Sequence, residues 1–75
     1  MPPRRLTYQG IADDLADRIK HGEYPPDQQI PSYTQLAALY GVSVATAQRA
    51  VALLRDRGLV VGVAGIGVFV APEEA

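Results

Sequence analysis

The chain has 75 residues, 48% hydrophobic and 20% charged, with seven basic and eight acidic side chains and a formal net charge of -1. A chain of this length holds one small domain, and this composition is that of a globular domain rather than a disordered tail. Because it has no cysteine and a single histidine, His21, it lacks a disulfide framework and the ligands of a structural zinc site, so we expect neither metal nor cofactor.

The first predicted element is an amphipathic helix over about residues 8–21. Ile11, Leu15 and Ile19 recur every four residues, while charged side chains occupy the other faces. Gly22 is expected to end the helix in a left-handed conformation, and the Pro-Pro pair that comes next forces an extended turn.

A short second helix is predicted to begin after Ser32. Ser32 and Gln35 have the spacing of a capping box, in which the serine hydroxyl accepts from the Gln35 amide and the Gln35 side chain reaches back. Leu36, Leu39 and Tyr40 are expected to form the inner face of this helix. The glycine that follows should end it after about eight residues.

Ser43 is the predicted cap of a third helix over residues 44–57, with Thr46 at the third helical position. The expected inner face consists of Ala47, Ala50, Val51 and Leu54. The expected outer face consists of Ala45, Thr46, Gln48, Arg49, Ala52 and Arg55. Two helices joined by a short turn that contains glycine form a helix-turn-helix unit.

After Gly58 the hydrophobic pattern changes from a helical period to that of strands. Residues 59–61 and 68–70 are rich in β-branched and aromatic side chains, and the segment 62–67 between them is rich in glycine. This pattern predicts a two-stranded hairpin with a glycine-rich tip. Because a lone hairpin is marginally stable in water, it must pack against the helices.

The predicted fold class is therefore mainly α with a small β-hairpin (α+β), a three-helix winged helix-turn-helix. We expect this domain over residues 7–71, between a flexible arm at 1–6 and a tail at 72–75. The start of the chain lacks the apolar stretch of a signal peptide, and no apolar run is long enough to span a bilayer. We expect a cytoplasmic protein without a membrane partner.

These residues, in this order, resemble the DNA-binding domain of the GntR family of bacterial transcription regulators. The most specific pieces are a Pro-Ser pair before the second helix, a Gly-Val-Ser turn and a terminal Gly-x-Gly-x-Phe-Val. The matching positions, which cover roughly residues 7–70, are Tyr8, Ile11, Ala12, Leu15, Ile19, Gly22, Pro26, Ile30, Pro31, Ser32, Leu36, Ala37, Gly41, Val42, Ser43, Thr46, Ala50, Leu54, Gly58, Leu59, Val60, Gly65, Gly67, Phe69 and Val70. The resemblance implies three helices and a wing, with the third helix in the major groove of DNA.

The departures from the family pattern fall on the surface that would touch DNA. Family members usually have Glu-Arg-Glu after the Pro-Ser pair, where this chain has residues 33–35, Tyr-Thr-Gln, and arginines where it has Val44 and Gln48. The wing places that usually carry arginines are held here by Gly62, Val63 and Ile66. The family also usually has a ligand-binding or dimerisation domain after the wing, where this chain stops.

The start of the third helix is the expected site of phosphate contact. Ser43 and Thr46 stand where free amides and the helix dipole favour an anion, although both residues are equally explained as caps. Arg49, Arg55 and Arg57 can each neutralise a phosphate, and Arg49 is the preferred candidate because Arg55 and Arg57 also complement the helix dipole. Two further expected contacts, at the start of the second helix, are Ser32 and Thr34.

Gln48 is the best candidate for reading a base. Its side-chain amide can bond an adenine edge at two atoms, and Val44 or Ala45 can touch a thymine methyl group, which predicts a preference for A·T pairs. The alternatives are that Gln48 is a solvated helix residue and that Val44 is partly buried.

The arm and the wing tip supply the remaining candidates for DNA contact. Arg4 and Arg5 can reach the DNA backbone or minor groove, or can serve solubility alone. Gly65 and Gly67 let the wing approach a backbone closely, yet hairpin geometry requires glycines there as well. Ile66 at the tip can wedge into a minor groove, contact a protein or fold back onto the core.

The leading hypothesis is sequence-specific binding of double-stranded DNA by a small, nucleoid-associated transcription regulator, with two copies on a symmetric or repeated site. The helix 44–57 would lie in the major groove and the wing 59–70 along the backbone. No catalytic constellation is present and so small a core leaves no room for an effector pocket, so neither an enzyme nor a small-molecule ligand is expected. The rival is a winged-helix protein-interaction module or regulator accessory subunit that has lost most DNA contacts. An apolar wing favours this alternative. So does the weak positive charge of residues 28–72, which contain three basic residues and one acidic residue.

Overall fold

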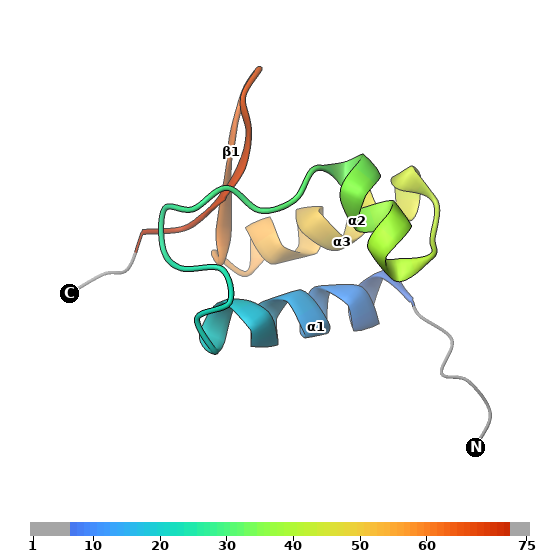
Figure 1. The fold of residues 1–75 in the computed structure, drawn as a ribbon, viewed down its shortest axis with the longest axis horizontal. Helices are drawn as coiled ribbons and strands as arrows, with labels where there is room; N and C mark the ends of the chain where they lie inside the picture. The colour runs from blue at the N-terminus through green and yellow to red at the C-terminus, as the bar shows by residue number, and fades with distance from the viewer. Residues whose placement is uncertain (1–6, 73–75) are drawn as a thin grey trace.

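Three helices and an antiparallel hairpin make up residues 7–72, which are the residues that the computed structural model describes. The elements are α1 (Tyr8–Lys20), α2 (Tyr33–Tyr40), α3 (Val44–Asp56), β1 (Val60–Val63) and β2 (Gly67–Val70). In Figure 1, α1 and α3 lie along each other, and the hairpin projects beyond the helices. The predicted winged helix-turn-helix is confirmed, whereas the expectations for residues 1–6 and 73–75 lie outside the described residues.

Side-chain caps define where the helices begin. The Thr7 hydroxyl accepts from the Gly10 amide at 3.1 Å and begins α1. The predicted capping box is present in full, because the Gln35 amide donates to Ser32 Oγ at 3.1 Å and the Ser32 amide donates to Gln35 Oε1 at 2.9 Å. Each cap satisfies amides that the first helical turn would otherwise leave unpaired, so these boundaries follow from local chemistry. At their other ends, α1 and α3 stop one residue earlier than predicted.

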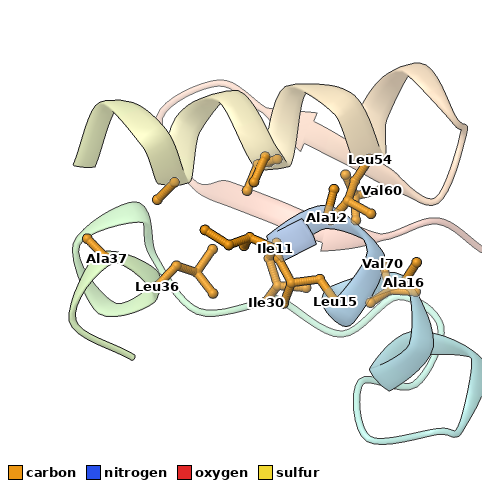
Figure 2. Packing of buried hydrophobic residues seen from close by; sticks show 13 residues of the cluster. Ile11, Ala12, Leu15, Ala16, Ile30, Leu36, Ala37, Leu54, Val60 and Val70 are labelled. Atoms are coloured by element: carbon orange, nitrogen blue, oxygen red, sulfur yellow. The ribbon is translucent and has the colours of Figure 1, made fainter. Parts of the chain in front are cut away.

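The core lies between the three helices and the base of the hairpin, where the labelled side chains of Figure 2 converge. The side chains that are fully buried and largest are Ile11, Leu15, Leu36, Val51, Leu54 and Val60. The expectation that Leu39 faces inward is wrong, because its side chain is 56% exposed. The inner stripe of α2 runs instead through Tyr33, Leu36, Ala37 and Tyr40, at the i, i+3, i+4 and i+7 positions, and Leu39 falls outside it.

A three-residue turn places α3 across α2. Gly41 adopts φ 66°, a left-handed conformation that favours glycine, and the Val42 amide donates to the Ala37 carbonyl at 3.0 Å. The bend between α2 and α3 is 108°, within the usual range for a helix-turn-helix of about 90–120°. Within residues 7–72, no single helix is long and apolar enough to cross a membrane.

The wing differs from its prediction in two respects. Its strands reach further towards the tip than expected, with Gly62 opposite Val68 and Val63 opposite Gly67, so that only residues 64–66 form the turn. In addition, the segment 27–30 pairs with the free edge of β2, an arrangement that the sequence analysis missed.

Three backbone hydrogen bonds hold this segment to β2. The Asp27 amide donates to the Val70 carbonyl at 3.0 Å, the Val70 amide to the Gln28 carbonyl at 2.8 Å, and the Ile30 amide to the Val68 carbonyl at 2.9 Å. Asp27 adopts φ 68° to make the turn that precedes this pairing. The hairpin is thereby anchored to the segment between α1 and α2, which covers an edge that would otherwise be open.

Candidate nucleic-acid interface

The outer face of α3 is open to solvent in the part of the chain that the structure describes. One side of the helix is buried through Ala47, Ala50, Val51 and Leu54. The exposed residues on its other side are Val44, Ala45, Gln48, Arg49, Ala52, Arg55 and, at the end of the helix, the acidic Asp56. The hairpin therefore leaves this face uncovered, as the sequence analysis predicted. Val44 is 41% exposed.

The hydroxyl groups at the start of α3 differ in what they can still donate. Ser43 Oγ accepts from the Thr46 amide at 3.1 Å and donates to Thr46 Oγ1 at 3.0 Å. The Ser43 hydroxyl hydrogen is therefore used within the protein, whereas the Thr46 hydroxyl hydrogen points to no acceptor among residues 7–72. At the start of α2, Ser32 and Thr34 are both exposed.

The arginines divide into two groups according to their partners. Arg18 contacts Asp14 at 2.9 Å and Glu23 at 2.6 Å, and Arg57 contacts Asp13 at 2.9 Å. Among residues 7–72, only Arg49 and Arg55 lack a carboxylate partner within 4.0 Å. Because both lie on α3, the arginine charge that is not neutralised is concentrated on this helix.

Arg49 is held by an aromatic ring instead of a carboxylate. The guanidinium carbon lies 4.3 Å from the centre of the Tyr8 ring, at the start of α1. Stacking on a ring face orients a guanidinium while leaving its N–H groups free to bind an oxygen. Arg49 was selected from sequence but Tyr8 was not, because the contact joins the start of α1 to the middle of α3, which are distant in sequence.

A network of acidic and hydroxyl groups lies away from the outer face of α3, between α1 and the end of α2. The Tyr40 hydroxyl donates to Asp14 Oδ2 at 2.6 Å, beside the Arg18 guanidinium. These two donors lower the pKa of Asp14, the Tyr40 bond having the larger effect. Burial raises the pKa of Tyr40, as does its bond to the Asp14 carboxylate. The Asp14 carboxylate is thereby paired with donors of the protein itself, the Tyr40 hydroxyl and the Arg18 guanidinium.

The wing tip is held in place by a side chain from another part of the chain. Gln29 Nε2 donates to the Ile66 carbonyl at 3.1 Å, and the Ile66 amide donates to the Val63 carbonyl at 3.0 Å. A Cβ on Gly67, whose φ is 150°, would collide with the Gln29 amide nitrogen, so this position admits the contact only as glycine. Gly65 adopts φ 77° in the turn. Ile66 itself is 65% exposed and does not fold back onto the core.

A hollow of about 550 Å³ lies between the wing and the helices. Its lining consists of Tyr33, Arg55 and residues 62–68. Gln29 was not singled out from sequence, Tyr33 was noted only as a departure from the family pattern, and Arg49 was preferred to Arg55. No local pattern identifies these three residues, because their placement depends on how the hairpin docks against the helices. Among residues 7–72, no three histidine, cysteine, aspartate or glutamate side chains are grouped to hold a metal ion.

Comparison with known proteins matches this arrangement to one family. The model of the gntR family of bacterial regulatory proteins matches residues 7–70. The histidine utilization repressor of Klebsiella aerogenes is 38% identical over 64 residues, which are 85% of this chain and 27% of the repressor. The HTH-type transcriptional repressor NagR of Bacillus subtilis is 36% identical over 69 residues, which are 92% of this chain and 28% of that repressor.

A solved structure of similar size agrees with the sequence matches. The AraR DNA-binding domain, crystallised in complex with operator ORR3, superposes with a TM-score of 0.82 at 32% identity, covering 95% of this chain and 92% of that chain. By contrast, this chain spans just over a quarter of the length of the two repressors. The match thus concerns one domain of those proteins.

Proposed function

This chain belongs to the gntR family of bacterial regulatory proteins as a winged helix-turn-helix DNA-binding domain, and from that membership we propose how it reads DNA. It inserts α3 into the major groove and places the wing along the flanking backbone. The observation that carries this proposal is the open outer face of α3, where Gln48 is exposed and Arg49 has no carboxylate partner among residues 7–72.

Residues in the first two turns of α3 contact the bases directly. Gln48 donates to and accepts from the major-groove edge of an adenine, a bidentate contact that contributes about 1–3 kcal/mol of discrimination. Val44 and Ala45 are exposed on the same part of the helix and contact thymine methyl groups. The site that this chain prefers therefore contains A·T pairs opposite the start of α3.

Phosphate contacts fix the register of α3 in the groove. Arg49 neutralises one phosphate, and the free hydroxyl hydrogen of Thr46 donates to another. Ser43 supports Thr46 through the hydrogen bond between their hydroxyls. The remaining proposed backbone contacts are Ser32 and Thr34 of α2, Gly65 and Gly67 of the wing, and Arg4 and Arg5, which lie outside the described residues.

Two copies of the domain bind one symmetric or repeated site, because a single module with so little free positive charge makes few contacts. With roughly three to five phosphates neutralised per copy, the slope of log affinity on log salt is about -3 to -5 per domain. As a bacterial transcription regulator, the protein acts at the nucleoid in the cytoplasm. The proposed DNA-binding unit is residues 7–71, between an arm at 1–6 and a tail at 72–75.

Selection of binding sites from random duplexes, followed by mobility-shift titration, tests this proposal. Arg49→Ala should weaken binding to all selected duplexes alike, whereas Gln48→Ala should relax the preference at one A·T pair. Lys20→Ala is the matched control, because Lys20 is an exposed basic residue on α1. If Gln48→Ala and Arg49→Ala both leave binding unchanged, α3 is not the reading element.

A further inference from the structure

We propose that Arg55 forms a second phosphate-binding position, in the hollow between the wing and the helices, and supplies the positive charge that the wing itself lacks. The ligand is a phosphodiester of the DNA strand that flanks the major-groove site. This inference rests on the proposed function, because it requires the wing to lie along the DNA backbone. It gives a position and a ligand to a residue that the sequence left open between phosphate contact and helix-dipole complementation.

The wing has no cation of its own among its described residues. From Leu59 to Pro72 the sequence contains no lysine, arginine or histidine, so side chains of the hairpin provide no positive charge to a phosphate. A hairpin that approaches a polyanion without positive charge gains little from electrostatics, since phosphate neutralisation is the main source of affinity for DNA. A cation from a neighbouring element is therefore needed if the wing is to bind a backbone.

Arg55 reaches the wing from the last turn of α3. In β1, Gly62 lies on the same face as the buried Val60, because alternate residues of a strand point to the same side, and this face is turned towards α3. A Cβ built on Gly62 would lie 2.8 Å from an Arg55 terminal nitrogen and 3.3 Å from its guanidinium carbon. The missing side chain of Gly62 thus makes the space that the guanidinium occupies.

The charge of Arg55 remains available in this position. Arg57, two residues further along the chain, is paired with Asp13 on α1 at 2.9 Å, whereas Arg55 has no carboxylate within 4.0 Å among residues 7–72. Arg55 is also exposed, and it lines the hollow together with Tyr33 and the wing. A guanidinium with free donors in an open hollow is suited to bind a phosphate oxygen.

The position of Arg55 also fits the rest of the proposed interface. Gln48, Ala52 and Arg55 are spaced i, i+4 and i+7, so they form one stripe along the exposed side of α3. Arg49 lies beside this stripe and is directed towards Tyr8 and α1, whereas Arg55, at the end of the stripe, is directed towards the wing. One arginine beside the base-reading stripe and one at its end, directed to opposite sides, are placed to contact the two backbones that border a groove.

The test compares Arg55→Gln with Arg57→Gln, using a duplex selected by the wild-type chain and mobility shifts over a range of salt concentrations. Both substitutions remove one positive charge near the end of α3, so their loss of long-range attraction is similar, and Arg57→Gln in addition breaks the ion pair with Asp13. We expect Arg55→Gln to weaken binding about threefold to tenfold at low salt and to reduce the salt slope by about one, and Arg57→Gln to change affinity less than twofold.

Gly62→Ala provides an independent variant that leaves the charge in place. Its methyl group displaces only the end of a flexible side chain, so thermal unfolding should be nearly unchanged while affinity falls. In the double variant with Arg55→Gln, adding Gly62→Ala should cause no further loss, since both changes act on one contact. Ethylation interference should show one flanking phosphate that matters for wild type and not for Arg55→Gln.

The possible results separate this inference from the proposed function. If the wild-type chain selects no duplex, the proposed function itself fails. If it binds a selected duplex and Arg55→Gln equals wild type or merely equals Arg57→Gln, Arg55 does not bind a phosphate and the inference is overturned. Additive losses in the double variant would likewise overturn it, because Gly62 would then act without Arg55.

Discussion

Helix α3 and the wing contribute to the same proposed interface in different ways. The exposed side of α3 carries an amide, a hydroxyl and two arginines, on a helix whose other side is fixed to the core by Leu54 and its neighbours. The wing carries glycines and aliphatic side chains, and its tip is held by Gln29. Helix α3 thus supplies the polar and charged groups of the proposed interface. The wing supplies a backbone surface whose position depends on residues distant in sequence.

This difference predicts which substitutions should alter the stability or the DNA binding of each region. In α3, a change on the buried side should affect stability and a change on the exposed side should affect the proposed DNA reading, so the two effects should separate by face. In the wing, the side chains proposed to support binding lie outside the hairpin, on the segment 27–30 and at the end of α3. Substitutions far from the wing in sequence should therefore alter what it does.

The largest expected effect is loss of the support beneath α3. Leu54 is fully buried, so Leu54→Ala removes packing and leaves a cavity that should lower the free energy of unfolding by about 2–5 kcal/mol. Leu39→Ala is the matched control, since Leu39 is 56% exposed and should cost at most about 0.5 kcal/mol. Denaturant unfolding measures both free energies, and equal losses would contradict the burial of Leu54 and the exposure of Leu39.

A smaller effect is expected where α2 is tied to α1. Tyr40→Phe removes the donor to Asp14 and should lower the free energy of unfolding by about 1 kcal/mol at neutral pH. The pKa of Asp14 is lowered in the folded state, so this stabilisation is present above the ordinary aspartate pKa and is lost as pH falls through the folded value.

Unfolding measured from neutral to acid pH checks this dependence. The wild-type advantage over Tyr40→Phe should narrow as the pH falls below the ordinary aspartate range. Tyr24→Phe is the control, because the Tyr24 hydroxyl makes no hydrogen bond within residues 7–72, and it should behave as wild type at every pH. A constant difference between wild type and Tyr40→Phe over the whole range would show that the carboxylate is not involved.

The wing should respond to a substitution outside it. Gln29→Met keeps the length of the side chain and removes the bond to the Ile66 carbonyl, so the tip loses a fixed position. We expect DNA affinity to fall by about 1 kcal/mol and the Ile66 amide to exchange faster with solvent. Gln28→Met, at the neighbouring exposed residue, should change neither. Unaltered exchange in Gln29→Met would show that the hairpin holds its own tip.

The smallest expected effect concerns the orientation of Arg49. Tyr8→Leu removes the ring beneath the guanidinium and should weaken DNA binding by about 0.5 kcal/mol, the usual size of an exposed cation–π contact. Tyr8→Phe keeps the ring face and should bind as wild type. If titration gives the same affinity for the two variants, the ring does not orient Arg49.

The helical part of the fold was predictable because its determinants are local. The Ser32–Gln35 capping box, the Ser43 cap and the periodicity of α3 all lie within one or two helical turns, and each was confirmed. Leu39 was misassigned because α2 is short, and two stripes with similar apolar content compete on an eight-residue helix.

The surroundings of the wing were not predictable, because they depend on contacts between residues far apart in the chain. Gln29 and Ile66 are 37 positions apart, and nothing in either neighbourhood indicates that they meet. Whether Arg55 has a carboxylate partner likewise depends on which arginines lie close to the acidic residues of α1. Sequence patterns therefore located the reading helix but not the residues that complete the interface around it.

Mapping of amide chemical shifts on addition of a selected duplex tests the account most directly. The largest changes should fall on Ser43 to Arg49, on Arg55 and on the wing tip, with α1 residues Asp13 and Asp17 nearly unaffected. Changes centred on the exposed face of α1, with those of α3 unmoved, would contradict it.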